Sequence, residues 1–109
     1  AKTTQARQRV GKVESNKISV RIELQADCYS GIWARNAERQ LGTIEKGDIA
    51  EAINAARQIG DDTLQRNSGQ RPMPHTFTHG TSKQRQRWFS TGYQTGKMAA
   101  CDTFVTDKL

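Results

Sequence analysis

The stretch that decides the fold is residues 15–40, SNKISVRIELQADCYSGIWARNAERQ, which contains no proline. Its large apolar residues recur close to helical spacing: Ile18, Ile22, Tyr29, Ile32 and Trp33. The pattern predicts one long helix over Ser15–Gln40, ended by Gly42, a residue type common just beyond helix C-termini. The preceding segment Gln5–Lys12 either extends this helix or frays, because Gly11 lowers the helix propensity there.

A second helix is predicted to begin at Asp48 and to end at Gly60. The Asp48 carboxylate can accept hydrogen bonds from the first turn, and Glu51 three residues later completes a capping box. The apolar residues of this segment mark one helix face: Ile49, Ala52, Ile53, Ala56 and Ile59.

The segment Asp61–Pro74 is predicted to be an extended loop. It is polar, and its two prolines, Pro72 and Pro74, each disfavour a helical conformation in the residue before them. A third helix is expected to begin near Thr81 or Ser82, since either residue can cap it.

This third helix should run to about Thr95, and Met98–Phe104 can form a last short turn. The predicted fold class is therefore all-α: a small helical subdomain of about three helices with one long Pro/Gly loop. With 109 residues the chain is expected to form a single domain, in which residues 1–14 fray or are disordered and residues 105–109 form a tail.

Apolar residues make up only 34% of the sequence, which is low for a self-sufficient globular domain. Because the helical patterns argue against disorder, we expect the largest apolar face to pack against a part that lies outside this sequence. The first residues contain no initiator Met and no signal-peptide core, so we expect a truncated chain. No run of about 18 apolar residues occurs, and no membrane span is predicted.

The chain is basic, with 17 Lys and Arg against 11 Asp and Glu and a formal net charge of +6. Such a charge can attract phosphate backbones or an acidic partner. The cations are spread along the chain, however, and only seven aromatic residues are present. We therefore expect a solvated basic surface, and nucleic acid is not the expected partner. The alternative functions are a basic binding module for nucleic acid or an acidic protein, and an interaction scaffold.

Two acidic residues, Glu23 and Asp27, lie four positions apart in the predicted long helix, so their carboxylates emerge one turn apart on one face. The neighbouring Ile22, Ala26 and Cys28 suggest partial burial, where two unpaired carboxylates are costly. A metal ion would resolve this, with one carboxylate as ligand and the other holding a ligating histidine. On spacing alone, two ordinary acids on a solvated helix surface are the more common explanation.

His79 lies in the motif FTHGTS (residues 77–82), just before a predicted helix start, from where an imidazole can reach into a cleft. Arg85, one turn later, could fix this loop or bind a carboxylate bidentately. An ordinary loop hydrogen bond is the alternative for His79, and His75 carries no comparable signal. The sequence contains no H-E-x-x-H motif, so no self-contained zinc site is predicted.

The two cysteines, Cys28 and Cys101, form no C-x-x-C pair and have no histidine cluster nearby, which argues against a cysteine-built metal site. Their spacing leaves a disulfide and two buried free thiols equally open.

Several motifs resemble the YpfJ-like neutral zinc metallopeptidases of bacteria. They are Ser19–Cys28 with Gly31–Trp33, Gly47–Ala52, Ile59–Asp62, Phe77–Ser82 with Arg85, Trp88–Phe89, and Ala100–Phe104. The motifs follow one another in unbroken order from about Asn16 to Phe104. Members of this family are longer, and their H-E-x-x-H lies upstream of the position equivalent to Glu23. The resemblance implies the C-terminal half of a zincin-type fold.

The resemblance also implies roles for individual residues. Glu23 would be the third zinc ligand, and Asp27 would orient a zinc-bound histidine of the missing N-terminal catalytic half. HtpX-like proteases have a Thr-His-Pro motif with a downstream arginine. By that analogy His79 would stabilise the oxyanion or shape the cleft, with Arg85 supporting loop or cleft, although Gly80 here replaces the proline.

The complete enzyme would then use zinc to hydrolyse a peptide or protein substrate, whereas this chain alone would be inactive and would bind zinc weakly. Members of the family share an N-terminal membrane anchor, which implies a catalytic domain on the extracytoplasmic side, either periplasmic or at the cell surface. That setting favours a disulfide between Cys28 and Cys101.

Overall fold

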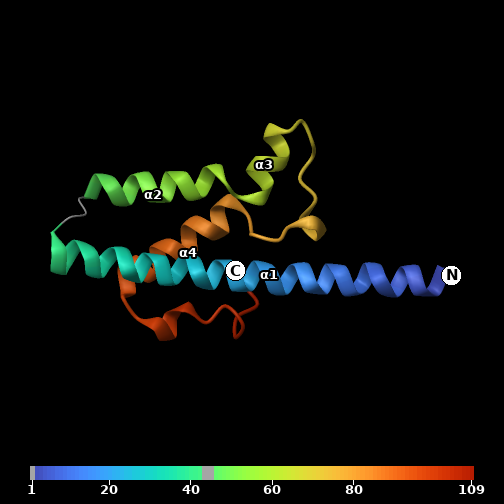
Figure 1. Cartoon of the computed structure of the whole chain (residues 1–109), viewed down its shortest axis with the longest axis horizontal. Helices are drawn as coiled ribbons and strands as arrows, with labels where there is room; N and C mark the ends of the chain where they lie inside the picture. Colours follow the sequence, from blue (N-terminus) through green and yellow to red (C-terminus); the bar gives the residue numbers. More distant parts are fainter. Residues whose placement is uncertain (1, 43–45) are drawn as a thin grey trace.

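The structure is a computed structural model that describes residues 2–42 and 46–109, with side chains described from residue 11 onward apart from those of residues 41, 46 and 56. The described residues form four α-helices and two short 3₁₀ turns (Figure 1). In chain order these are α1 (Lys2–Leu41), α2 (Lys46–Gln58), α3 (Asp61–Asn67), η1 (Pro74–Thr76), α4 (Ser82–Thr95) and η2 (Met98–Cys101). The all-α prediction is confirmed.

The boundaries of α1 and α2 differ from the predicted ones at their N-termini. α1 begins at Lys2, so the segment before Ser15 continues the long helix. α2 begins at Lys46, two residues before the predicted start, which places Asp48 inside the first turn. By contrast, α4 agrees with its prediction. Thr81 caps it, and Thr81 and Gln84 bond each other's backbone N–H groups through their side chains in a capping box.

The prediction of an extended loop over residues 61–74 is wrong for its first half, because Asp61–Asn67 form α3. Both acids of its first turn, Asp61 and Asp62, favour a helix N-terminus electrostatically. The turn is further held by backbone hydrogen bonds from Leu64 N–H to the Gly60 carbonyl and from Asp61 N–H to the Gly80 carbonyl, each 2.9 Å. The prolines restrict the backbone only beyond this helix.

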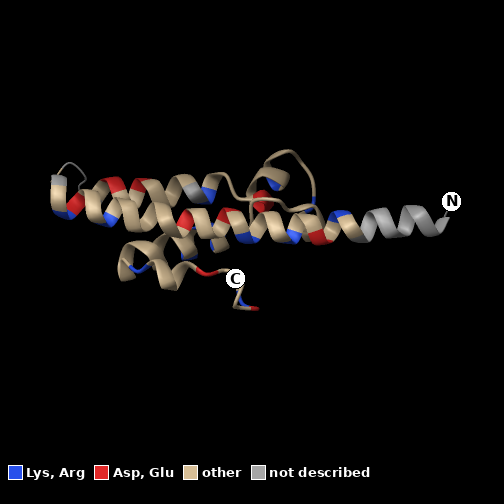
Figure 2. Ribbon diagram, turned by 60° about the horizontal axis from the view of Figure 1, so that its bottom comes forward, with Lys and Arg blue, Asp and Glu red and all other residues tan. Residues whose placement is uncertain are grey.

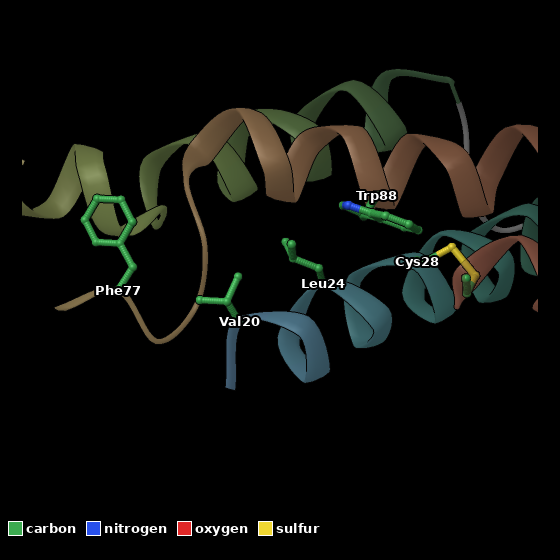
Figure 3. Packing of buried hydrophobic residues seen from close by; sticks show 6 residues of the cluster. Val20, Leu24, Cys28, Phe77 and Trp88 are labelled. Carbon is green, nitrogen blue, oxygen red and sulfur yellow. A yellow bond between two sulfur atoms is a disulfide. The ribbon is translucent and has the colours of Figure 1, made fainter. Parts of the chain in front are cut away.

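The core forms where α4 packs against both α1 and α2. Figure 3 shows its main cluster, in which buried side chains from α1 meet those of α4 and of the loop before it. The cluster consists of Val20, Leu24, Cys28, Phe77, Trp88 and Cys101, with Ile32 and Leu109 partly buried against it. A second cluster joins Ala34, Ile49 and Phe89 where α2 reaches α4. Both α1 and α4 contribute to the two clusters, and α4 is the helix that packs against both α1 and α2.

The face that α1 buries is not the face marked by its largest apolar residues. Ile18, Ile22, Tyr29 and Trp33 are 51%, 54%, 39% and 66% exposed. The buried face instead carries mostly small residues beside Val20 and Leu24: Cys28, Gly31, Ala34 and Ala37. Small residues line the buried face of α1 because they let α4 approach closely. A methyl group on Gly31 would collide with the Phe89 carbonyl, and one on Gly92 would collide with the Cys28 carbonyl.

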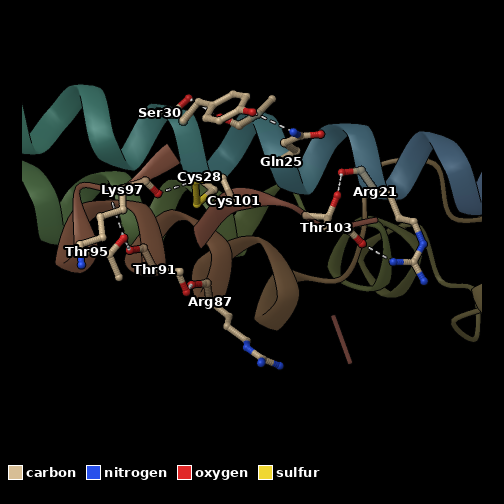
Figure 4. Close-up of a disulfide and its surroundings, with 12 residues drawn as sticks. Arg21, Gln25, Cys28, Ser30, Arg87, Thr91, Thr95, Lys97, Cys101 and Thr103 are labelled. Carbon is tan, nitrogen blue, oxygen red and sulfur yellow. Dashed lines mark hydrogen bonds between the residues drawn. A yellow bond between two sulfur atoms is a disulfide. The ribbon is translucent and has the colours of Figure 1, made fainter. Parts of the chain in front are cut away.

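The C-terminal segment contacts α1 and α4. Cys28 and Cys101 are joined by a disulfide, and Arg21 donates a hydrogen bond to the Thr103 carbonyl (Figure 4). Arg21 also donates to the Thr106 carbonyl at 2.8 Å. In addition, the indole N–H of Trp88 donates to the Leu109 carbonyl at 3.0 Å.

Candidate metal-ligand and cleft site

The structure brings Glu23, Asp27, His79 and Arg85 together, although the first two lie 52 or more positions before the last two in the sequence. Glu23 and Asp27 lie one turn apart on α1. His79 lies in the loop before α4, and Arg85 lies in the first turns of α4. The close packing of α1 on α4 therefore positions the cluster.

Asp27 and Arg85 form a bidentate ion pair. Arg85 Nε donates to Asp27 Oδ2 and Nη2 donates to Oδ1, both at 3.0 Å, and the side chains are only 15% and 13% exposed. Burial raises the pKa of the Asp27 carboxyl, and the neighbouring Glu23 charge raises it further. Arg85 and His79 lower this pKa, but the net shift is upward. Hydrogen bonding to Asp27 raises the pKa of Arg85. The pair is thus fixed in orientation and largely buried.

Glu23 and His79 form the accessible half of the cluster. His79 Nδ1 lies 3.7 Å from Glu23 Oε1, and the two side chains are 49% and 40% exposed. Carboxylate oxygen and imidazole nitrogen are both ligand types that zinc accepts. The donor chemistry fits part of a zinc site, with one carboxylate in place on α1. Within the described residues, however, no group of three His, Cys, Asp or Glu side chains is arranged to hold a metal ion.

A residue that the sequence reasoning left without a role, Asp61, fixes the loop that carries His79. One oxygen of its buried carboxylate accepts hydrogen bonds from the backbone N–H groups of His79 and Gly80, at 2.7 and 2.8 Å. Gly80 has φ +98°, and a methyl group there would lie 3.1 Å from Leu24 Cδ2. Glycine at position 80, where the related motif has proline, suits this conformation.

The next acid, Asp62, fixes the start of α4. Its carboxylate accepts a hydrogen bond from Ser82 N–H at 2.8 Å. Burial raises the pKa of the Asp62 carboxyl, but hydrogen bonds from the backbone of Ser82 and Thr63 and from the Ser82 side chain outweigh it, and the net shift is downward. Two acids directly after Gly60 were a signal for the start of α3, since a helix N-terminus favours acids, but not for either of these contacts.

A groove of about 740 Å³ lies beside this cluster, between α1 and the loop around η1. Val20, one turn before Glu23, lines it, as do Thr81 and Gln84, which follow His79. His75 also lines the groove; it is exposed, and its carbonyl accepts a hydrogen bond from Asn16 at 3.1 Å. The groove therefore lies on the same elements as the candidate site, but none of its four residues, Glu23, Asp27, His79 and Arg85, lines it.

Charged residues do not separate into a basic and an acidic side along the helices. Figure 2 shows Lys and Arg interspersed with Asp and Glu on α1 and α2 over the described residues. None of the helices in the described part of the chain combines the length and the apolar character that crossing a bilayer requires.

Two carboxylates one turn apart on α1 thus lie next to a loop histidine, and both side-chain types occur as zinc ligands. A family model described as "Putative neutral zinc metallopeptidase" matches residues 1–104, and the chain belongs to this family. The resemblance seen in the sequence is thereby confirmed.

Two relatives illustrate the match. The Escherichia coli K12 protein named uncharacterized protein YpfJ is 50% identical over 103 residues, which cover 94% of this chain and 36% of that protein. The Mycobacterium tuberculosis H37Rv protein named uncharacterized protein Rv2575 is 46% identical over 94 residues, covering 78% of this chain and 32% of that protein. The chain thus spans about a third of the length of these relatives. No solved structure matches it significantly.

Proposed function

We propose that this chain is the C-terminal part of a zinc-dependent peptidase, in which it supplies one zinc ligand and part of the substrate cleft. The observation that carries the proposal is the cluster of Glu23, Asp27, His79 and Arg85, in a chain of the zinc metallopeptidase family. The zinc, when bound, would polarise a peptide carbonyl and lower the pKa of a water molecule.

Glu23 is the proposed third zinc ligand. Its carboxylate is accessible and is not engaged in a close ion pair, since His79 lies at 3.7 Å. Catalytic zinc sites use three protein ligands, and the sequence has no H-E-x-x-H to supply two histidines and a general base. The partner that supplies them is the N-terminal catalytic half, so this chain alone is expected to be inactive.

Asp27 is proposed to accept a hydrogen bond from the ring N–H of one of those zinc-binding histidines. An ionised carboxylate has about four lone-pair sites, and Arg85 uses two of them. The remaining sites can accept the N–H of a ligating imidazole, which fixes its ring orientation. Arg85 therefore positions Asp27. This role is narrower than the support of the loop or cleft that the sequence resemblance implied for Arg85.

His79 is proposed to face the scissile carbonyl of a peptide or protein substrate that lies next to Glu23. The Asp61 clamp holds its backbone, while its side chain stays half exposed on the Glu23 side. An imidazole there can donate a hydrogen bond to the carbonyl oxygen as it gains negative charge.

The disulfide between Cys28 and Cys101 supports an extracytoplasmic location over a cytoplasmic one, because disulfides persist in oxidising compartments. The membrane-anchored parent rests on the family resemblance alone. A basic binding module is less well supported, since the cations are not gathered on one face in Figure 2.

The test uses a chimera in which this chain replaces the matching region of the E. coli relative. Glu23→Gln should lose zinc, because it removes the charged ligand. Asp27→Asn should lower zinc affinity by roughly 10–100-fold. His79→Ala should keep zinc but hydrolyse a fluorogenic peptide about 10²–10³-fold more slowly. Zinc is measured by atomic emission, and Glu14→Gln, an exposed acid on the same helix, is the control. Full zinc in Glu23→Gln would refute the ligand assignment.

A further inference from the structure

Residues 60–63 and 79–82 form two turns that contact each other, and we call this contact the junction. The first turn begins α3, whereas the second carries the histidine of the candidate site and begins α4. Asp61 N–H donates to the Gly80 carbonyl at 2.9 Å, and Gly80 N–H donates back to Asp61 Oδ2 at 2.8 Å. The two turns are therefore joined by hydrogen bonds in both directions.

The close approach of the two turns depends on Gly60. A methyl group on Gly60 would lie 2.2 Å from the Ser82 nitrogen, so no side chain fits between the turns. Ser82 N–H donates to Asp62 Oδ1 at 2.8 Å, and the hydroxyls of Ser82 and Thr63 lie 2.5 Å apart. Adjacent acids therefore hold different parts of the second turn, because Asp62 bonds Ser82 whereas Asp61 bonds the residues before it.

Asp61 holds the second turn with a buried carboxylate. The residue is only 9% exposed, and Oδ2 accepts from the N–H groups of His79 and Gly80 at 2.7 and 2.8 Å. A carboxylate is costly to remove from water unless hydrogen bonds stabilise its charge, and hydrogen bonds to a charged acceptor are stronger than neutral ones. The pKa of Arg85 is raised mainly by its hydrogen bond to Asp27, and the charge of Asp61 adds to this. The buried charge is therefore placed where it holds the backbone of one cluster residue and favours the charged form of another.

The imidazole of His79 depends on this backbone for its position. Gly80, the next residue, has φ +98° and lies against Leu24. The imidazole itself is 49% exposed, and its Nδ1 lies 3.7 Å from Glu23 Oε1, which is longer than a hydrogen bond. Since no close bond to Glu23 holds the ring, the direction of the Cα–Cβ bond, which the backbone sets, decides where the ring points.

We infer that Asp61 is a positioning residue for the proposed reaction: it holds the backbone of His79 so that the imidazole faces the carbonyl oxygen of a substrate beside Glu23. The inference rests on the proposed function of His79. Asp61 acts through His79 and contacts neither the substrate nor the zinc. A misplacement of about 1 Å is enough to slow an enzyme about 100-fold. An Asp61 variant should therefore lose rate only when His79 is present.

A double-mutant comparison in the chimera described above tests the inference. Asp61→Ala should lower kcat about 10–100-fold, while KM and zinc content stay within about twofold of the parent. In the His79→Ala background the same substitution should lower kcat by less than about twofold, because no imidazole is left to position. Asp61→Asn keeps one acceptor oxygen and should recover part of the loss. It also carries the comparison if Asp61→Ala does not fold.

Asp62→Ala is the matched control, because it removes the neighbouring acid and its bond to Ser82 N–H but leaves the bond to His79 in place. Any loss of kcat that it causes should be the same with and without His79. Amide hydrogen exchange of His79 and Gly80, resolved by fragmentation mass spectrometry in EDTA, gives a readout that does not depend on zinc. This exchange should be at least about tenfold faster in Asp61→Ala, but not in Asp62→Ala.

Equal losses of kcat for Asp61→Ala with and without His79 would overturn the inference and leave the proposed function in place, since Asp61 would then act on the fold alone. Unchanged amide exchange at His79 and Gly80 in Asp61→Ala would overturn it as well. A fully active His79→Ala variant would instead refute the proposed role of His79, and the inference would fail with it.

Discussion

Removing the disulfide between Cys28 and Cys101 should strongly destabilise this chain. The bond links the middle of α1 to η2 across a sequence separation of 73 residues. In the chain-entropy model a closed loop of that length lowers the entropy of the unfolded chain enough to stabilise the fold by about 4 kcal/mol. Small domains have free energies of unfolding of about 5–15 kcal/mol, so the bond provides a large share of the total.

The perturbation is the double substitution Cys28→Ala and Cys101→Ala, and the assay is urea unfolding followed by circular dichroism at 222 nm. The midpoint should fall by an amount equivalent to about 4 kcal/mol, and the slope m should rise, because the unfolded chain without the bond exposes more surface. Both sulfurs are fully buried, so a smaller packing loss adds to the effect.

Two comparisons separate the bond from simple packing. Each single variant should lose nearly as much stability as the double variant, because either substitution breaks the same bond. Losses that add up would indicate packing effects of two free thiols. A double variant within 1 kcal/mol of the parent, or two alkylated thiols in the unreduced parent, would refute the reasoning.

Two further predictions concern the helix contact and the start of α4. Gly31→Ala should lower the free energy of unfolding by about 1–3 kcal/mol, because the methyl group meets the Phe89 backbone. Gly11→Ala in the same helix meets nothing and should raise it by about 0.5–1 kcal/mol; both are measured by urea unfolding, and equal effects would contradict the close contact. Asp62→Asn should destabilise at neutral pH. Because the folded pKa of Asp62 is lowered, its contribution is fully present above the unfolded pKa of about 3.8 and is lost as pH falls through the folded pKa. Thermal melts of Asp62→Asn and the parent should therefore converge below that pH, and a constant gap would contradict the assignment.

The long helix and the capped helix α4 could be predicted from sequence because their signals are local. Apolar residues at helical spacing in a stretch without proline indicate the long helix. A Thr81 cap, with Gln84 three residues later, indicates the start of α4. The buried face of α1 could not be predicted in the same way. Both sides of that helix carry apolar residues, and the larger ones, such as Ile22 and Trp33, face outward. Choosing the inner side requires knowing that Gly92 lets another backbone reach Cys28.

The residues of the candidate site could be predicted from the sequence, but the contacts between them could not. Glu23 with Asp27 and His79 with Arg85 were each recognisable as pairs along the chain. That Arg85 meets Asp27, and that Asp61 holds the His79 loop, depends on contacts between elements 18–58 residues apart. α3 was missed for the same reason, since its hydrogen bond to Gly80 is a tertiary contact that the polar sequence does not reveal.

The electrostatics of the cluster connect these observations to the proposed zinc site. Arg85 pairs with Asp27 in good geometry, yet burial and the charge of Glu23 still leave the Asp27 pKa raised. Arg85 therefore offsets only part of the effect that burial and the Glu23 charge have on the Asp27 carboxyl. In the proposed zinc site a further positive charge would lie on the Glu23 side, where the carboxylate is accessible and His79 is nearby. A divalent cation bound there would lower the pKa of the Asp27 carboxyl, and Arg85 would keep Asp27 oriented to hold a ligand of that cation.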